Sequence, residues 1–560
     1  MGRYWLAAVM VAARLLGGNV RADQALTEEQ KIVHVLNRLG FGPRPGDVER
    51  VQKLGLEKYI EQQLQPARIN DDALQRKLAA LTVLPMSDTA LAEDFREEQR
   101  ERQEFQKARA AATNDATKVD APRRNMQERF NHPSARAVAE LQAGKIISAV
   151  ESERQFQEVL VDFWSNHFNI DVRKNACRVL KVVDEREVIR AHVFGQFRDL
   201  LAASAKSPAM LVYLDNAQNS VARDFGPMGG RFRPPGGAET NAVRRGNGGL
   251  NENYAREIME LHTLGVDAGY TQKDVIEVAR CLTGWGIEIR TGKFQFHNFR
   301  HDNGAKSVLG HTIPAAGGQA DGEKVLDILS RHPATAKFIA TKLCRRLVAD
   351  EPPPALVTRV AKVFLDTDGD LPKVYAAIVR SPEFFSAGAL HAKIKSPFEY
   401  AVSAVRALGG SVAVPESKLR EAMDTAATFG RERFGNRNTL NMQLQQMGQT
   451  LFAFQAPTGW PEDSRKWVST GALISRLNFA IALTGRNVSD VTLDLSAAAM
   501  GVDSDQPQAV IDRLATVLVH GPLTAATRQT LEQQLAGSGK TVDIPQLTAL
   551  ILGAPEFQRR

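Results

Sequence analysis

The chain has 560 residues, of which 43% are hydrophobic and 24% charged, and its formal net charge is +7. This composition excludes a wholly disordered chain, a collagen-like fibre and a polytopic membrane protein. The small excess of basic residues is spread over a long chain, so it does not indicate nucleic acid as a partner.

The first residues have the pattern of a secretory signal peptide over residues 1–22. Arg3 precedes an apolar run at 6–13, and cleavage is expected after Ala22. We therefore expect a periplasmic or secreted protein. A buried first helix is the alternative, but it would place Arg3 and Arg14 on either side of its apolar stretch. No stretch of about 18 apolar residues occurs, so no membrane span is expected.

Helical periodicity dominates the rest of the chain, and long runs of strict alternation are scarce. The pattern therefore predicts an all-α fold, a large multi-helical body. Apolar residues recur at three- and four-residue spacing over residues 31–39, 46–63, 156–168, 185–203, 251–263, 271–282, 334–348, 371–379 and 471–483.

Two polar segments interrupt the helical pattern, and we use them to divide the chain into the expected helical regions. An N-terminal helical region over 23–215 contains a charged arm at 93–129, whose mixed signs favour a solvated helix or a flexible excursion. Residues 216–249 are rich in Gly, Pro and Arg, which predicts a flexible loop. A central helical region over 250–410 and a C-terminal helical region over 411–560 follow.

A short pattern occurs twice in the second half of the chain. Asp370 precedes a Leu-Pro pair and is followed by Glu383, and Asp543 precedes an Ile-Pro pair and is followed by Glu556 at the same spacing. Asp caps helices and Pro is tolerated in their first turn. We therefore predict two copies of one helical hairpin.

The three cysteines are widely separated, so they form neither a zinc motif nor a disulfide framework. Cys281 and Cys344 lie in apolar helical patterns. Such cysteines are more often small core residues than nucleophiles.

The segment 251–262 is the most informative part of the sequence. On a helix, Arg256, Glu257 and Glu260 share one face, whereas His262 lies on the opposite apolar face as a core histidine. The polar face has two interpretations. It is either a solvated surface with an Arg256 to Glu260 pair, or one wall of a cleft in which two carboxylates act as acid and base or as metal ligands.

Other polar clusters surround His167, Asp215 and the pair His301 and Asp302. No pair of histidines at helical spacing and no paired cysteines join these clusters into a zinc motif. Any shared site must therefore be assembled by folding.

Several short phrases occur in order along the chain. Together they resemble the bacterial family catalogued as domain of unknown function 1800, from about residue 30 to about 485, and the tail beyond residue 488 resembles it least. The resemblance implies an exported helical protein without an assigned reaction, often encoded beside an exported sulfatase-like family. The phrases are LNRLGFGP at 36–43, FWSNHF at 163–168, PAMLVYLDN at 208–216, the segment 251–266, YTQ at 270–272, LTGW at 282–285, HD at 301–302, HPATA at 332–336, KSP at 395–397 and GWP at 459–461.

Two hypotheses of function follow. The first is an exported enzyme, for example a hydrolase, that acts on a polar or anionic substrate in a cleft formed by eight residues. The glutamates would be acid and base or ligands of a divalent metal, Arg256 would hold an anion, and His167 or His301 would carry a proton. The alternative is a non-catalytic interaction protein that supports a sulfatase-like partner. The eight residues are Glu252, Arg256, Glu257, Glu260, His167, Asp215, His301 and Asp302.

Overall fold

The computed structural model describes residues 25–111, 132–221, 249–414, 438–495, 506–536 and 542–560. The predicted signal peptide, the outer part of the charged arm and most of the Gly-rich loop lie outside these ranges. Helices dominate the described residues, which confirms the all-α prediction. None of the helices in these ranges has both the length and the hydrophobicity to cross a bilayer.

The first half of the described chain is helical, with one π-helix, η3. Residues 46–63 form two helices and not the single predicted one, because Gly55 adopts a φ of 92° between them. The elements are α2 (Glu28–Arg38), α3 (Asp47–Leu54), α4 (Leu56–Gln63), η1 (Pro66–Arg68), α5 (Asp72–Leu78), α6 (Asp88–Ala111), α8 (Pro133–Glu151), α9 (Gln155–His167), α10 (Cys177–Val183), η3 (Asp184–Arg190), α11 (Phe197–Lys206), α12 (Pro208–Tyr213) and η4 (Asn216–Gln218).

The predicted helix over 185–203 is also divided, into η3 and α11. Between them the chain pairs with a distant segment: Phe197 N–H donates to Gly369 O at 2.8 Å, and Leu371 N–H donates to Gly195 O at 3.1 Å. Backbone groups used in this pairing are not available to a continuous helix.

The second half adds helices and three antiparallel pairs of very short strands, β1 with β2, β3 with β4 and β5 with β6. The elements are α13 (Glu252–Glu260), α14 (Gln272–Cys281), β1 (Trp285–Ile287), β2 (Phe294–Phe296), η6 (Asn298–Arg300), β3 (Lys306–Val308), β4 (His311–Ile313), α15 (Ala320–Ser330), α16 (Pro333–Leu347), α17 (Pro354–Asp366), α18 (Leu371–Val379), α19 (Pro397–Ala407), β5 (Ser411–Val412), α21 (Leu440–Gln446), η7 (Ser464–Trp467), α22 (Thr470–Thr484), β6 (Val491–Thr492), α24 (Pro507–Leu518), α25 (Ala525–Ala536), α26 (Ile544–Gly553) and α27 (Pro555–Gln558).

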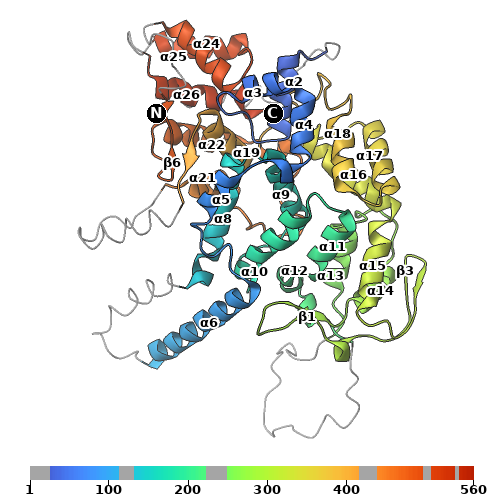
Figure 1. The fold of residues 1–560 in the computed structure, drawn as a ribbon. Coiled ribbons are helices and arrows are strands. Elements are labelled where there is room, and N and C mark those ends of the chain that lie inside the picture. The colour runs from blue at the N-terminus through green and yellow to red at the C-terminus, as the bar shows by residue number, and fades with distance from the viewer. Residues whose placement is uncertain (1–24, 112–131, 222–248, 415–437, 496–505, 537–541) are drawn as a thin grey trace.

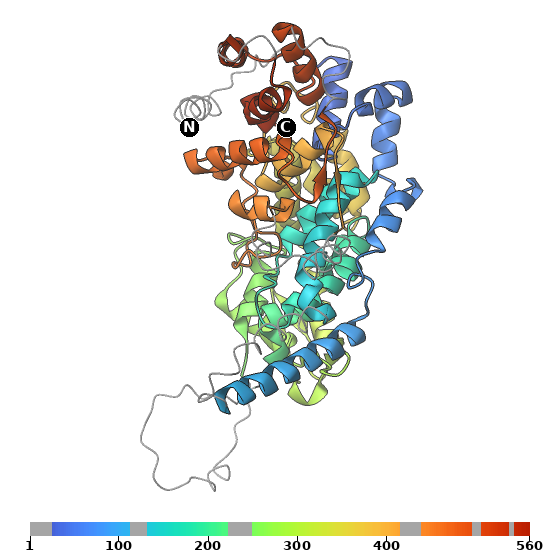
Figure 2. The ribbon, with the colours of Figure 1, turned by 90° about the vertical axis from the view of Figure 1, so that its left-hand side faces the viewer.

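The molecule is elongated, as Figures 1 and 2 show. Helices α24, α25 and α26 lie with α2, α3 and α4 at one end, and α13, α14 and β1 lie toward the other. Helix α9 runs through the middle. The described parts of the N-terminal, central and C-terminal regions share one continuous hydrophobic core.

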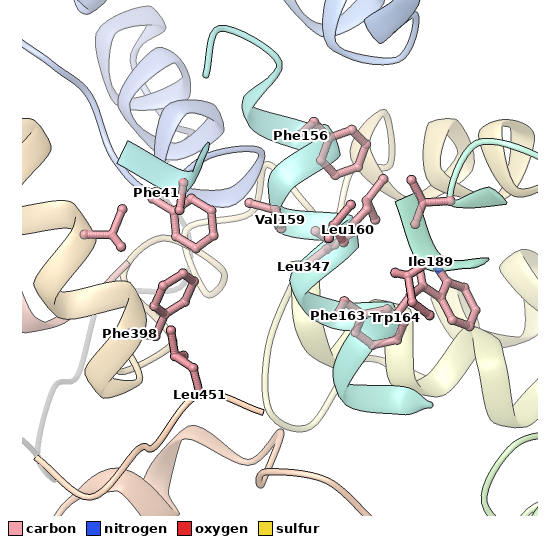
Figure 3. Packing of buried hydrophobic residues seen from close by; sticks show 14 of the residues in the cluster. Phe41, Phe156, Val159, Leu160, Phe163, Trp164, Ile189, Leu347, Phe398 and Leu451 are labelled. Atoms are coloured by element: carbon pink, nitrogen blue, oxygen red, sulfur yellow. The ribbon is translucent and has the colours of Figure 1, made fainter. Parts of the chain in front are cut away.

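Helix α9 is the centre of this core. Phe156, Leu160, Phe163 and Trp164 are fully buried at helical spacing on one of its faces (Figure 3). The indole N–H of Trp164 donates to Tyr375 Oη at 2.7 Å, so the one polar atom of this large side chain is satisfied. The other face of α9 carries Asp162, Ser165 and Asn166, which the core does not use.

The repeated pattern forms the helix caps that were predicted. Asp370 caps α18 by accepting from the backbone N–H of the third helical residue, and Asp543 caps α26 in the same way. Glu383 pairs with Arg359 of α17, and Glu556 accepts from a threonine of α25. In each copy, the glutamate that follows the second helix therefore ties the chain back to the first helix.

The predicted core positions of Cys281, Cys344 and His262 are confirmed, since all three are buried. Cys177, the third cysteine, is also buried, and all three cysteines are free. Burial raises the pKa of each thiol to about 12, so none is reactive as a thiolate at neutral pH.

The charged arm begins as α6 and is packed in part against the body. Glu98 is buried, accepts from Ser134 Oγ at 2.8 Å and pairs with Arg178 of α10. His132, just before α8, lies 3.2 Å from Asp94 and 2.9 Å from Glu101, both on α6. The described part of the arm is therefore held by charge pairs and is not entirely solvated.

We predict that His132 makes the docking of α6 dependent on pH. Burial lowers the pKa of His132, but hydrogen bonds to Glu101 and Asp94 outweigh burial and raise it overall. This stabilisation is complete below the unfolded pKa, about 6.5, and is lost as the pH rises through the higher folded value. We expect faster amide exchange in α6 at pH 8 than at pH 6, after correction for intrinsic rates, and no such difference in His132→Gln. Equal protection of α6 in the wild type at both values would contradict this.

Candidate functional site

The predicted polar row on α13 forms a surface network. Arg256 lies 4.0 Å from Glu252 and 3.4 Å from Glu260, and it donates to Gln272 Oε1 at 2.7 Å. The side chains of Arg256, Glu252 and Glu260 are 38%, 40% and 20% exposed. These ion pairs are accessible to water, so they contribute little to stability.

Glu257, the remaining acid of the row, is half-buried. Burial raises the pKa of its carboxyl group, the nearby Glu260 raises it further, and Arg256 opposes both. The direction matches that expected for two neighbouring acids. Glu257 and Glu260 thus share an electrostatic environment at the edge of α13.

Two of the other predicted residues lie close together but have different partners. His301 is buried, with Nε2 3.1 Å from a carboxylate oxygen of Asp321 that also receives Lys306 Nζ at 2.5 Å. Asp302 pairs with Arg280 of α14 at 2.8 Å. Both anchor the loop between β2 and β3 to its neighbouring helices.

Asp215 and His167 complete the predicted set. The Asp215 side chain is 54% exposed and pairs with Lys174 at 2.8 Å. His167 is buried at the end of α9 and contacts Lys342 of α16. The eight predicted residues are therefore distributed over the α13 row and four other sets of partners, and none of them lines the pocket described next.

A pocket lies between α9, α16, α19 and the segment 449–467. The volume open to the centre of a water molecule is about 50 Å³. About 10–15 Å³ of such volume accommodates one water, so the space suits a small polar group. We call it the interhelical pocket. Its lining residues are Lys145, Asp162, Phe163, Ser165, Asn166, Asn169, Arg346, Lys393, Ile394, Ser396, Glu399, Gln449, Leu451, Phe452, Trp460, Pro461, Glu462, Ser464, Trp467 and Arg560.

Carboxylates bridge basic side chains along the wall of this pocket. Asp162 of α9 lies 2.7 Å from Lys145 and 2.9 Å from Arg346. Glu399 of α19 lies 3.0 Å from Arg346 and 2.7 Å from Arg560. Burial raises the pKa of Glu399, but Arg560 and Arg346 outweigh burial and lower it to about 2. Glu399 is therefore ionised at neutral pH.

Local sequence explains how these groups reach the pocket. Ser396 and Glu399 form a capping box at the start of α19, which orients the glutamate. The preceding residues pair with the end of the chain: Lys395 N–H donates to Gln558 O, and Arg560 N–H donates to Lys393 O, both at 2.8 Å. This pairing brings Arg560 beside Glu399.

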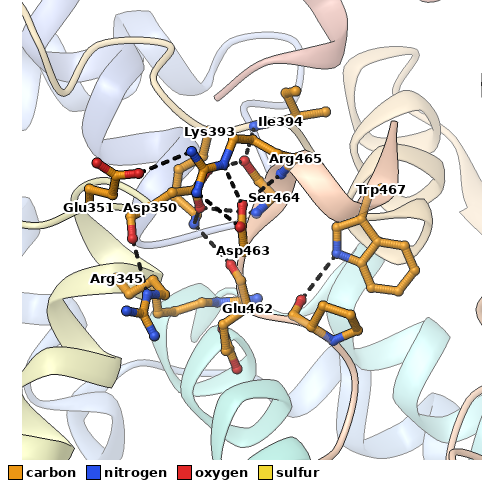
Figure 4. A network of polar contacts seen from close by, with 12 residues as sticks. Arg345, Asp350, Glu351, Lys393, Ile394, Glu462, Asp463, Ser464, Arg465 and Trp467 are labelled. Carbon is orange, nitrogen blue, oxygen red and sulfur yellow. Dashed lines mark hydrogen bonds and ion pairs between the residues drawn. The ribbon is translucent and has the colours of Figure 1, made fainter. Parts of the chain in front are cut away.

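Lys393 connects the pocket to a second network (Figure 4). Its ammonium pairs with Asp350 and donates to Glu462 O at 3.2 Å, while the Ser464 hydroxyl donates to the other oxygen of Asp350 at 2.5 Å. Burial lowers the pKa of Lys393 to about 8, although Asp350 opposes this effect.

Behind this wall lie three buried cations without an acid partner. Arg38 donates to Ala389 O at 2.6 Å, Lys395 to Ser403 Oγ at 2.7 Å, and Arg476 to Lys395 O at 2.7 Å. In the described ranges no carboxylate lies within 4.0 Å of any of the three. Burial lowers the pKa of Lys395 to about 7 and that of Arg476 to about 10.

The guanidinium groups also have unused donors. The Nε atoms of Arg346 and Arg560 are buried and lack a hydrogen-bond acceptor among the described residues, as do Nε and Nη1 of Arg38. Buried donors without acceptors are costly. The side chains present can therefore bind a small anion, which would supply both charge and acceptors.

Sequence reasoning missed the pocket as a site. Two of the phrases that carry the family resemblance, FWSNHF and KSP, contain Ser165, Asn166 and Ser396, and a third, GWP, contains Trp460. These phrases were the signal in the sequence from which the pocket could have been found. As for the expected divalent metal, no three His, Cys, Asp or Glu side chains gather as a metal site requires within the described part of the chain.

The chain matches a protein-family model over nearly its whole length. The family model described as "Protein of unknown function (DUF1800)" matches residues 34–559. The match thus includes the tail beyond residue 488, where the sequence resemblance is weakest. No curated protein and no solved structure matches the chain.

Proposed function

Because the chain belongs to the DUF1800 family, whose description assigns no function, we propose one from its own geometry: it binds a small anionic group in the interhelical pocket. We further propose that it acts outside the cytoplasm as an enzyme on a polar or anionic substrate. The signal-like residues 1–22 support the location.

The excess of buried positive charge carries the binding proposal. Six basic side chains are buried in and behind the pocket wall, and three carboxylates pair with only three of them. A fourth carboxylate of the wall, Glu462, forms no ion pair with any of the six among the described residues. An uncompensated buried cation is costly, and a bound anion would reduce that cost. The basic side chains are Arg38, Arg346, Lys393, Lys395, Arg476 and Arg560, and the paired carboxylates are Asp162, Asp350 and Glu399.

The size and rim of the pocket limit the ligand. A volume of about 50 Å³ accommodates a carboxylate, phosphate or sulfate group and not a whole sugar. Trp460 and Trp467 line the rim with ring centroids 5.6 Å apart, and both are half-exposed. The uncharged part of a substrate would pack against these rings.

Anion titration tests the proposal. We expect sulfate or phosphate to raise the melting temperature of the wild type at constant ionic strength. Arg346→Lys keeps the charge but loses the planar fork of donors, so we expect about tenfold weaker binding. Arg359→Lys, at an exposed pair on α17, is the matched control and should bind as the wild type. If neither anion binds, or if Arg346→Lys binds as tightly as the wild type, the proposal is wrong.

The half-exposed polar row on α13 favours the alternative function, binding of a partner protein, for the surface that this row forms. Glu252, Arg256 and Glu260 are paired and accessible, as on a contact surface. A non-catalytic protein supporting a sulfatase-like partner would use such a surface. Charge reversal at Glu252 and Glu260 would then weaken partner binding and leave anion binding in the interhelical pocket unchanged.

A further inference from the structure

Lys342 of α16 has an unusual environment for a lysine. It lies one helical turn before Arg346, on the side of α16 that faces α9. Its Nζ is 3.0 Å from Nδ1 of His167 and 5.6 Å from the centre of the Phe338 ring. In the described ranges no carboxylate lies within 4.0 Å of this amine, which distinguishes it from the paired lysines of the pocket.

The partner of Lys342 is fixed in one hydrogen-bonding state. Nε2 of His167 lies 3.1 Å from the carbonyl oxygen of His262, so this nitrogen carries the proton. Nδ1 is then an acceptor for Lys342. Burial and the nearby Lys342 hold the pKa of His167 well below its usual value, so the ring stays neutral.

The surroundings favour the neutral amine. Aromatic rings of Phe163 and Phe168 flank His167. The other charged or titratable groups near Lys342 are Glu462, Arg345 and His262. Burial lowers the pKa of Lys342, Glu462 opposes this effect and Arg345 adds to it.

We propose that Lys342 is a nucleophilic amine that condenses with the carbonyl group of an aldehyde or ketone. The neutral amine keeps one N–H donated to His167 and presents its lone pair to the carbonyl carbon. The ammonium first gives one proton to solvent. The N–C bond then forms as the C–O π bond breaks, and one hydrogen moves from nitrogen to oxygen to give the carbinolamine. Its hydroxyl group takes up a proton from solvent and leaves as water, and the protonated imine keeps one N–H.

This site is separate from the interhelical pocket, and its neighbours explain why Lys342 is the reactive lysine. Lys181 and Lys306 are fully buried and pair with carboxylates at 2.6 Å and 2.5 Å, so their amines are inaccessible and have an acid partner. Lys342 is only half-buried and lacks such a pair. It therefore combines a partly exposed side chain with a lowered pKa.

Reductive trapping on the intact protein tests the inference. With pyridoxal and cyanoborohydride at about pH 7.5, we expect Lys342 to be labelled severalfold faster than Lys362, whose side chain is 74% exposed. The labelling rate of Lys342 should also reach its plateau at a lower pH. Labelling of Lys342 no faster than Lys362, or with the same pH profile, would overturn the proposal.

Two further measurements separate this site from the pocket and define the role of His167. Labelling by pyridoxal that sulfate does not suppress supports the inference, whereas labelling only by pyridoxal 5′-phosphate, suppressed by sulfate, would overturn it.

Variants of His167 test its role. His167→Asn can keep an acceptor near the position of Nδ1 and should retain most of the labelling rate. His167→Phe removes the acceptor and should slow labelling severalfold; if both variants match the wild type, His167 does not position the amine.

Discussion

Replacing Glu399 by Gln is expected to destabilise the protein by about 3–5 kcal/mol. The carboxylate is buried between Arg346 and Arg560, and its removal leaves both guanidinium groups without their shared anion. Denaturant unfolding measures the change. Glu383→Gln removes one carboxylate from a pair with the half-exposed Arg359 and should cost less than about 1 kcal/mol.

The pH dependence of this variant gives a second check. The folded pKa of Glu399 is about 2 and the unfolded value is about 4.3. Because the folded pKa is lowered, the stabilisation is complete above the unfolded pKa and is lost as the pH falls through the folded value. The difference between wild type and Glu399→Gln should therefore shrink as the pH falls below about 4.3. A difference that is constant from pH 7 to pH 3 would contradict the assigned role.

Replacing Trp164 by Ala is expected to cost about 3–5 kcal/mol, because it opens a large cavity beside α9. The change also removes the N–H donated to Tyr375. Tyr375→Phe is the control: it keeps the ring but removes the hydroxyl, which also donates to Val193 O at 2.8 Å, and should cost about 1–3 kcal/mol. Equal losses in the two variants would show that the cavity contributes little.

The helical body could be predicted because its signals are local. The apolar spacing in α9, the capping residues Asp370 and Asp543 and the membership of the family were all readable from the sequence. The break at Gly55 was less visible, since the helical pattern continues on both sides of that residue. Local sequence patterns show which face of a helix is apolar, but they do not show whether the helical backbone continues without a break.

The site could not be predicted in the same way. The row of Arg256 and Glu260 has the spacing of a functional face, yet spacing does not determine whether another element covers it. The interhelical pocket depends instead on which distant segments of the chain pair with each other. Residues 393–395 pair with 558–560, and no local pattern predicts pairing between short segments so far apart.

The pairing at residues 393–395 also bears on how the protein acquires its binding site. The walls of the interhelical pocket come from stretches near residues 145, 162–169, 346, 393–399 and 449–467, together with Arg560. Contacts between such distant stretches require the closure of very long loops, which slows folding. The pocket should therefore be among the last features to form during refolding. No internal fragment that lacks either α9 or residues 558–560 should contain a complete pocket.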